Sequence, residues 1–198
     1  MSQKNLKMSK NIRKNILVFS NLANSSHVGS CLSIVDILTS LYNNIFKLNS
    51  KKKIKQLKNR FILSKGHACL ALYCLLYEKK IISKKLMNTY GKNESILMQH
   101  ASHYVRGVNF STGSLGHGLP VAVGLALSNK IKKNKNKVYV LMSDGEMNEG
   151  TTWEAMLFAN YHKLNNLVVI IDNNKLQSLT YTRETLNVEP LDKKFKSF

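Results

Sequence analysis

The sequence is poor in residues that crosslink or punctuate a chain, with three cysteines and two prolines in 198 residues. The cysteine count is odd, and no C-x-x-C or zinc-type spacing is present, which excludes a disulfide framework and a zinc ribbon. All three cysteines lie among apolar residues, so we expect buried free thiols in a reducing compartment. They are Cys31, Cys69 and Cys74.

Long hydrophobic runs are also missing. The N-terminal stretch MSQKNLKMSKNIRKN has no apolar core, so it does not resemble a signal peptide. No apolar run approaches the roughly 20 residues that a membrane helix needs. We therefore expect a cytoplasmic protein with no membrane partner.

Acidic residues are scarce. The sequence has 11 Asp and Glu residues against 30 Lys and Arg residues, which gives a net charge of +19. Such a charge is typical of proteins that bind polyanions. Almost all of it is lysine, however, with runs at Lys51–Lys53 and Lys132–Lys137, whereas specific phosphate and base readout favours arginine. The lysines, together with abundant Asn and Ile, indicate a compositional bias, so we expect no specific nucleic-acid partner. The apolar fraction of 43% suits a folded chain, and we predict a single domain over residues 1–198.

In the first half of the chain, apolar periodicity predicts amphipathic helices at residues 12–23 and 31–46. The basic stretch 51–58 is expected to be a loop. A short strand is predicted at 60–64, and the nearly all-apolar stretch 68–78 is predicted to be a buried helix.

The second half alternates strands and helices. Continuous apolar runs predict buried strands at 137–143 and 166–172, joined by a helix at 148–164 whose aromatic residues Trp153, Phe158 and Tyr161 are expected in the core. Strand, helix and strand in this order form a crossover of parallel strands, so the fold class is α/β. A further helix at 121–133 begins after Pro120, which suits a first helical turn.

Polar residues follow both predicted strands. Asp144 ends the first strand, and Asp172, Asn173 and Asn174 end the second. In an open parallel sheet ligands bind beyond the carboxyl ends of the strands, and carboxylate and amide oxygens suit Mg²⁺ or Ca²⁺. Magnesium takes further ligands from phosphates, and the loop STGSLGHG before a helix offers a phosphate cradle. The alternative is that these are an ordinary surface turn and an ordinary glycine-rich loop.

Four segments, in order, resemble the N-terminal half of transketolases: NSSHVGSCLSIVDIL, RFILSKGHACLALY, STGSLGHGLPVAVGLAL and SDGEMNEGTTWEAMLFANYHKLNNLVVIIDNNKLQ. The last is similar to the thiamine diphosphate motif of that family, and the tail NVEPLDKKFKSF is similar to the family's next segment. The resemblance implies a three-layer α/β/α fold with a mostly parallel sheet.

The resemblance also implies two cofactors, thiamine diphosphate and Mg²⁺. It assigns the metal ligands to Asp144, the side chain of Asn174 and the backbone carbonyl of Leu176. Gly145 and Glu146 would lie against the diphosphate, and Asp172 would support its neighbours. The other implied cofactor contacts, together with Asn174, are His67, Gly113, Ser114 and Leu115.

Three further residues carry implied catalytic roles. His27 and His103 match substrate-contacting histidines, with His100 as the competing choice for the second. Glu149 matches a glutamate that couples paired active sites. Alternatively, His27 caps a helix and Glu149 is a carboxylate favoured at a helix N-terminus, a role compatible with coupling. The sequence departs from the family pattern at three positions, Ser26, Val28 and Ser143.

The implied activity is transfer of a two-carbon ketol unit from a ketose or its phosphate to an aldose or its phosphate. The glutamate that activates the cofactor belongs to the other half of the family, and nothing after Leu176 matches that half. We therefore expect a C-terminal, pyrimidine-binding partner subunit in a heterotetramer, and a diphosphate domain that is incomplete at its C-terminal end. The alternatives are another thiamine diphosphate enzyme half, of the deoxyxylulose phosphate synthase or dehydrogenase kind, or a non-catalytic scaffold subunit.

Overall fold

The computed structural model describes residues 2–48, 58–178 and 180–198. The backbone contacts divide the chain into two compact units, each built from two segments. Unit 1 comprises Met1–Lys58 and Gly66–Gly113, and unit 2 comprises Asn59–Lys65 and Ser114–Phe198. Whether they act together as the single predicted domain stays a prediction. The predicted basic loop lies outside the described residues, except for Lys58.

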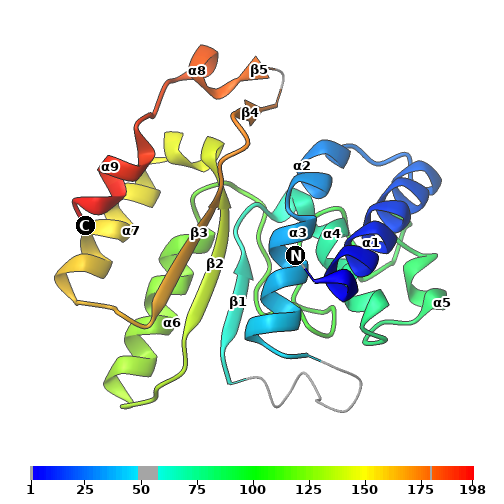
Figure 1. The fold of residues 1–198 in the computed structure, drawn as a ribbon, viewed down its shortest axis with the longest axis horizontal. Helices are drawn as coiled ribbons and strands as arrows, with labels where there is room; N and C mark the ends of the chain where they lie inside the picture. The colour runs from blue at the N-terminus through cyan, green and yellow to red at the C-terminus, as the bar shows by residue number, and fades with distance from the viewer. Residues whose placement is uncertain (1, 49–57, 179) are drawn as a thin grey trace. The chain divides into compact units, whose positions relative to one another are not determined.

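Unit 1 is helical (Figure 1). Its elements are α1 (Gln3–Leu22), α2 (Val28–Ser33), α3 (Val35–Ser40), the π-helical turn η1 (Leu41–Ile45), the 3-10 turn η3 (Gly66–Ala68), α4 (Cys69–Glu78) and α5 (Lys84–Met87). The predicted buried helix is confirmed as α4, in which every residue from Cys69 to Leu76 is buried. All three cysteines are buried, and none of them forms a disulfide, as predicted.

Two helix predictions in unit 1 need correction. Helix α1 begins nine residues earlier than predicted, because Ser2 caps it and polar side chains share its buried face. Among them, Ser9 donates a hydrogen bond to Thr39, a contact that apolar periodicity cannot reveal. The predicted helix 31–46 is instead three pieces, α2, α3 and η1, because the backbone at Ile34 leaves the helical region between α2 and α3.

Unit 2 contains a parallel sheet in the order β1 (Arg60–Leu63), β2 (Val138–Ser143) and β3 (Leu167–Asp172). Leu63 is level with Leu141, and Ser143 is level with Asp172, so all three strands end at one edge. The central strand β2 is buried along its whole length, as predicted. Strand β3 was predicted to be buried, but it is half-buried up to Asp172, because it is an outer strand of the described sheet.

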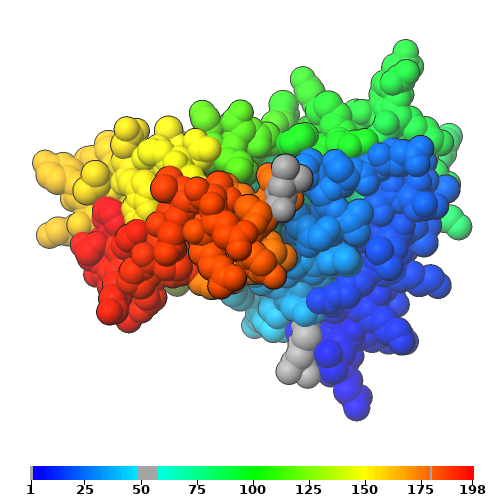
Figure 2. Space-filling model, turned by 90° about the horizontal axis from the view of Figure 1, so that it is seen from above, coloured from blue at the N-terminus to red at the C-terminus, as the bar shows by residue number. Residues whose placement is uncertain are grey.

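The remaining elements of unit 2 are α6 (Gly118–Ile131), the 3-10 turn η4 (Asp144–Asn148), α7 (Gly150–Tyr161), the hairpin β4 (Leu176–Gln177) and β5 (Thr180–Tyr181), α8 (Thr182–Thr185) and α9 (Leu191–Lys196). Pro120 lies in the first turn of α6, as expected. Helices α6 and α7 pack on one face of the sheet (Figure 1). Figure 2 shows the C-terminal segment (red) against α7 (yellow), where Trp153 contacts Phe195.

The predicted core face of α7 is wrong. Phe158 is 45% exposed and Tyr161 is 82% exposed, while Trp153 is partly buried. The buried side of the helix is instead formed by the small residues Thr152, Ala155 and Ala159. Their spacing defines a helical stripe, and small side chains let α7 approach its neighbours closely.

Candidate functional site

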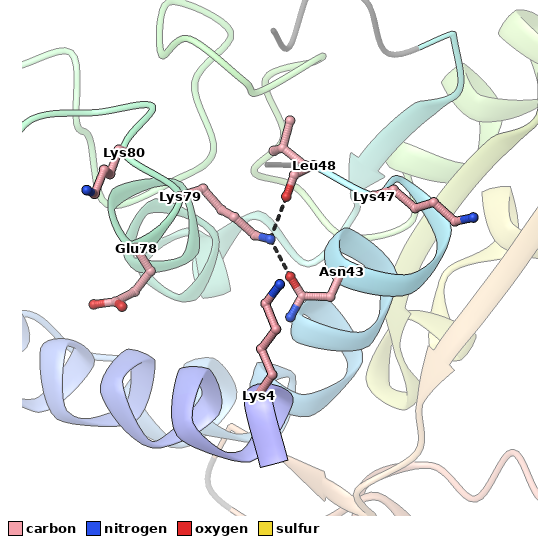
Figure 3. A pocket seen from close by; sticks show the side chains of 7 residues that line it. All are labelled: Lys4, Asn43, Lys47, Leu48, Glu78, Lys79 and Lys80. Atoms are coloured by element: carbon pink, nitrogen blue, oxygen red, sulfur yellow. Dashed lines mark hydrogen bonds between the residues drawn. The ribbon is translucent and has the colours of Figure 1, made fainter. Parts of the chain in front are cut away.

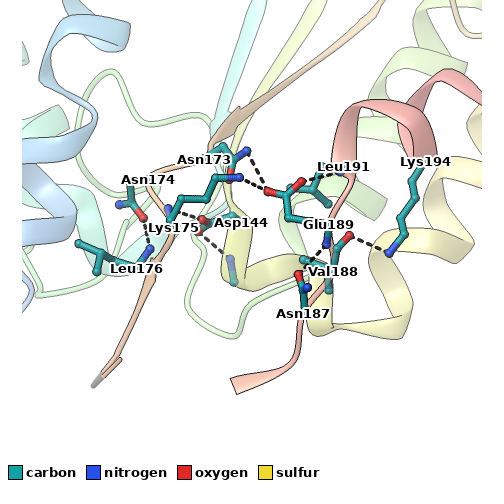
Figure 4. A network of polar contacts seen from close by, with 11 residues as sticks. Asp144, Asn173, Asn174, Lys175, Leu176, Asn187, Val188, Glu189, Leu191 and Lys194 are labelled. Atoms are coloured by element: carbon teal, nitrogen blue, oxygen red, sulfur yellow. Dashed lines mark hydrogen bonds and ion pairs between the residues drawn. The ribbon is translucent and has the colours of Figure 1, made fainter. Parts of the chain in front are cut away.

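Asp144 directly follows β2 and is only 1% exposed. Its Oδ1 accepts a hydrogen bond from the Gly145 N–H at 3.0 Å, and its Oδ2 accepts one from the Lys175 N–H at 2.7 Å. Burial raises the pKa of the Asp144 carboxyl, and these two hydrogen bonds oppose the rise. The bond from Lys175 holds the carboxylate against the loop that follows β3 (Figure 4).

That loop supplies two further oxygens. Asn174 Oδ1 accepts a hydrogen bond from the Leu176 N–H at 2.9 Å, and Leu176 opens β4. The chain turns at Lys175, whose φ of +64° lies in the left-handed region. A carboxylate, an amide oxygen and the main-chain carbonyl of Leu176 thus belong to adjoining segments. Hard oxygen donors in this small number suit Mg²⁺, which keeps few protein ligands.

No group of three or more His, Cys, Asp or Glu side chains able to hold a metal occurs in residues 2–48, 58–178 and 180–198. Zinc and iron sites usually draw on such groups. An ion at Asp144 would therefore need the amide and carbonyl oxygens of the next loop, together with ligand phosphates, as the predicted magnesium set does.

The loop after β3 is also held from the C-terminal side. Lys175 forms an ion pair with Glu189, and Asn173 donates to the same carboxylate at 3.4 Å (Figure 4). Glu189 accepts a further hydrogen bond from the Leu191 N–H at 2.8 Å. The hydrogen bond from Lys175 lowers the pKa of the Glu189 carboxyl. The segment before α9 therefore fixes the loop that carries Asn174.

Glu146 is fully buried, and its carboxylate accepts three hydrogen bonds from three segments of unit 2. Its Oε1 accepts from Ser64 Oγ at 2.5 Å and from the Gly116 N–H at 3.0 Å, and its Oε2 accepts from the Ser143 N–H at 2.9 Å. Burial raises the pKa of this carboxyl. The family resemblance predicts that Glu146 lies against a diphosphate. Here its carboxylate serves to hold the glycine-rich loop to the ends of β1 and β2.

Gly116 of that loop occupies a position that excludes a side chain. Its φ is +78°, and a Cβ there would lie 2.5 Å from Thr151 Oγ1 and 2.6 Å from Glu149 Cβ. Thr151 Oγ1 also donates to the Gly116 carbonyl at 3.1 Å. The loop therefore packs on the first turn of α7, where Glu149 is exposed. Ser114 is exposed and Leu115 half-buried just before Gly116.

In unit 1 the structure brings three histidines together. The ring centroid of His27 lies 5.1 Å from that of His67 and 6.3 Å from that of His100. His67 Nε2 and Ser30 Oγ are 2.7 Å apart. Partial burial and, to a smaller extent, His100 lower the pKa of His27. A Cβ on Gly113 would lie 3.8 Å from the His100 ring, so Gly113 lies beside this cluster.

His103, the first choice for the second substrate histidine, has different neighbours. Its Nδ1 lies 2.7 Å from Ser111 Oγ, and its ring centroid lies 4.2 Å from that of Tyr104, with the two rings tilted by 33°. The role of His103 stays a prediction, but the structure groups His100 with His27. The His100 carbonyl accepts from Tyr73 OH at 3.0 Å, and this anchor from α4 could not be seen in the sequence.

Sequence reasoning also missed Lys65, which follows β1 and is 1% exposed. Its Nζ lies 2.7 Å from Asp172 Oδ2. The only sequence signal was a lysine directly after a buried strand, which is equally typical of a strand end that reaches solvent.

A separate cavity of about 310 Å³ in unit 1 contains none of these residues (Figure 3). It is lined by Lys4, Asn43, Lys47, Leu48, Glu78, Lys79 and Lys80. Lys79 Nζ donates to the Leu48 carbonyl at 2.6 Å and to Asn43 Oδ1. Burial and the charge of Lys4 lower the pKa of Lys79. This lysine thus ties α4 to the chain around and after η1.

Among the helices of the described residues, none has the length and apolar character required to cross a membrane.

Comparisons with known proteins agree with these features. The family model described as "Transketolase, thiamine diphosphate binding domain" matches residues 5–198. The chain is 44% identical over 194 residues to an apulose-4-phosphate transketolase subunit of Actinobacillus succinogenes, covering 97% of this chain and 70% of that protein. It is 36% identical over 173 residues to the 6-deoxy-6-sulfo-D-fructose transketolase subunit SqwG of a Clostridium species, covering 87% of this chain and 63% of that one.

Solved structures show the same similarity. The chain superimposes on a transketolase from Campylobacter jejuni with a TM-score of 0.89 at 28% identity, covering all of this chain and 32% of that one. For a transketolase from Leishmania mexicana the TM-score is 0.87 at 26% identity, covering 100% and 31%. These matches confirm the predicted α/β fold with a mostly parallel sheet. The chain spans about a third of the length of these solved proteins.

Proposed function

Because the chain belongs to the transketolase family, through its thiamine diphosphate-binding domain, we propose that it is one subunit of a transketolase that uses Mg²⁺. The reaction would move a two-carbon ketol unit from a ketose to an aldose. The observation that carries the proposal is the oxygen set of Asp144, Asn174 and Leu176, which adjoin through the bond from the Lys175 N–H to Asp144.

In this proposal Asp144, Asn174 Oδ1 and the Leu176 carbonyl hold Mg²⁺. The diphosphate lies against Gly145 and the backbone of the loop at Ser114 and Leu115. Glu146 does not contact the diphosphate in this proposal. Its carboxylate accepts a hydrogen bond from the Gly116 N–H and so holds the loop that does.

The remaining predicted cofactor contacts are His67 and Gly113. When bound, thiamine diphosphate supplies the carbanion chemistry that breaks and forms a C–C bond next to a carbonyl.

The histidines of unit 1 would handle protons on the sugar. The lowered pKa of His27 keeps its ring neutral near pH 7, so that it can accept a hydrogen bond or a proton from a substrate hydroxyl. We propose that His100 shares this role, because its ring lies near that of His27. Glu149, exposed at the start of α7, is proposed to couple the paired active sites.

The names of the relatives bear on the sugar and on the assembly. Two of them act, by name, on apulose 4-phosphate and 6-deoxy-6-sulfo-D-fructose, and both are named as subunits. We therefore place the substrate among ketoses that carry an anionic end group. We also propose a pyrimidine-binding partner subunit, in a heterotetramer, that supplies the glutamate activating the cofactor.

The test is calorimetric titration of thiamine diphosphate into the chain, with Mg²⁺ or with EDTA. We expect Mg²⁺-dependent binding that weakens by about a hundredfold in Asp144→Ala, because the site loses its only charged metal ligand. Asp192→Ala is the matched control, since Asp192 is an exposed carboxylate on α9 that pairs with Lys196. Its binding should equal that of the wild type.

If the folded chain binds no thiamine diphosphate, either alone or with a candidate partner subunit, the non-catalytic scaffold subunit is the alternative that remains. If binding is present, a ketol-transfer assay set against a decarboxylation assay separates a transketolase from another thiamine diphosphate enzyme half.

A further inference from the structure

The ion pair between Lys65 and Asp172 joins the two outer strands of the described sheet. Asp172, the last residue of β3, is level with Ser143, the last residue of β2, and Lys65 follows the end of β1 by two residues. Neighbouring strands are about 4.8 Å apart, so the lysine side chain spans the width of β2 to reach Asp172. The Nζ–Oδ2 distance is 2.7 Å, and the two side chains are 1% and 8% exposed.

Stability alone is a poor explanation for such a pair. Removing two charges from water costs several kcal/mol per ion, about as much as their attraction returns, and well-packed apolar residues often do as well. The pair is also placed at the edge of the sheet where Asp144 begins η4. The other contacts of the Asp172 carboxylate therefore bear on its role.

Asp172 Oδ2 accepts a hydrogen bond from Asn174 Nδ2 at 3.5 Å, while Asn174 Oδ1 accepts from the Leu176 N–H at 2.9 Å. The amide nitrogen of Asn174 thus faces a hydrogen-bond acceptor, and its amide oxygen faces a donor. Turning the amide over would set its oxygen against the carboxylate and its N–H group against the Leu176 N–H. The Leu176 N–H on Oδ1 and the Asp172 carboxylate on Nδ2 thus favour the same orientation of the Asn174 amide.

We propose that Lys65 and Asp172 are positioning residues for the magnesium site: Lys65 holds the Asp172 carboxylate in place, and Asp172 orients the Asn174 amide so that Oδ1 is presented as a metal ligand. The inference rests on the proposed function, because it concerns the same metal. It assigns a role to Lys65, which contributes no ligand itself, and it explains why a buried charge pair lies at this edge of the sheet.

The experiment removes the ion pair without leaving a lone buried charge. In Lys65→Met with Asp172→Leu, both charges are replaced by apolar side chains of similar length, so the melting temperature should stay near that of the wild type. We expect Mg²⁺ affinity, measured by calorimetry at saturating thiamine diphosphate, to fall by about 10- to 100-fold. Bound Mn²⁺, counted by electron paramagnetic resonance, gives a second readout that does not depend on turnover.

A rescue separates orientation from packing. A carboxylate presents an oxygen whichever way it faces, so adding Asn174→Asp to the double variant should restore most of the lost affinity. In the wild-type background the same change places a second carboxylate beside Asp172 and should bring no comparable gain. If Asn174→Asp raises the Mg²⁺ affinity by the same factor in the wild type and in the double variant, the gain comes from the added charge alone and the proposal is wrong.

Two other results would also overturn it. One is unchanged Mg²⁺ affinity in the folded double variant, while the wild type binds Mg²⁺ and Asp144→Ala binds it weakly. That result would contradict the role of Lys65 and Asp172 but would leave the proposed function unaffected. The other is absence of Mg²⁺-dependent binding in the wild type, which would remove both. Should the double variant fail to fold, Asp172→Glu displaces the carboxylate by one methylene and keeps its charge. A loss of Mg²⁺ affinity in that folded variant is the expected result, and wild-type affinity would contradict the proposal.

Discussion

Glu146 is a fully buried residue whose carboxylate accepts hydrogen bonds from two backbone N–H groups and from Ser64 Oγ. In Glu146→Gln the side chain keeps one acceptor and gains an amide N–H group that must face the Ser143 N–H or the Gly116 N–H. We expect a loss of about 1–3 kcal/mol in the free energy of unfolding, because a buried donor is left unpaired. Urea unfolding measures it, and thiamine diphosphate titration should show weaker binding as the loop loosens.

The control for this change is Glu154→Gln on α7, where the side chain is exposed. It should change the unfolding free energy by no more than about 0.5 kcal/mol. Equal stability of Glu146→Gln and the wild type would show that the three hydrogen bonds to this carboxylate are dispensable.

At the scale of single residues, the sequence predicts positions better than orientations. The strand ends and the spacing to Asn174 predict that Asp144 and the loop after β3 adjoin, and the bond from the Lys175 N–H shows that they do. Ser64, one partner of the Glu146 carboxylate, lies 82 positions away, and the partner of Lys65 lies 107 positions away. Such contacts follow from tertiary packing, which local pattern does not contain.

At the scale of elements, the glycine-rich loop offers a matched pair of substitutions. Gly116→Ala forces a Cβ against Thr151 and Glu149 at a φ of +78°, whereas Gly124 lies within α6 with nothing within 4 Å of its Cβ position. Gly116→Ala should lower stability by more than about 1 kcal/mol and weaken cofactor binding. Gly124→Ala should raise stability by about 0.5–1 kcal/mol and leave cofactor binding unchanged.

Thermal unfolding and thiamine diphosphate titration on both variants decide this prediction. A Gly116→Ala variant as stable as Gly124→Ala would mean that the contact between the loop and α7 tolerates a side chain.

The confirmed element predictions are those with an unambiguous pattern. The strands β1, β2 and β3 and the helix α4 were found because continuous apolar runs indicate buried elements, and the length of each run together with its β-branched residues separates strand from helix. The failures in α1 and α7 share one cause, since small or polar residues form part of the buried face of each helix. In α7 the small residues Thr152, Ala155 and Ala159 are buried while Leu157 is 62% exposed, so a pattern read from large apolar residues selects the wrong side.

At the scale of the whole molecule, fold class was predictable and the division into units was not. Alternating strands and helices predict a parallel α/β sheet, which the structure and the comparisons confirm. The two compact units each combine segments that are distant in sequence, and β1 belongs to unit 2 although unit 1 surrounds it in the chain. Composition shifts and linkers mark boundaries only between contiguous domains, so they carry no signal here.

The net charge of +19 leads to a last prediction, about polyanions. If the charge reflects composition alone, binding to duplex DNA should be non-specific. Fluorescence anisotropy should then give equal affinities for two unrelated duplexes of the same length. The affinity should fall about a thousandfold or more between 50 and 200 mM salt, as expected when some six or more phosphates are neutralised. Thiamine diphosphate binding through Mg²⁺ and backbone groups should change far less over that range. A preference for one duplex that persists at 200 mM salt would instead indicate base readout, and the lysines would then need a function separate from the cofactor site.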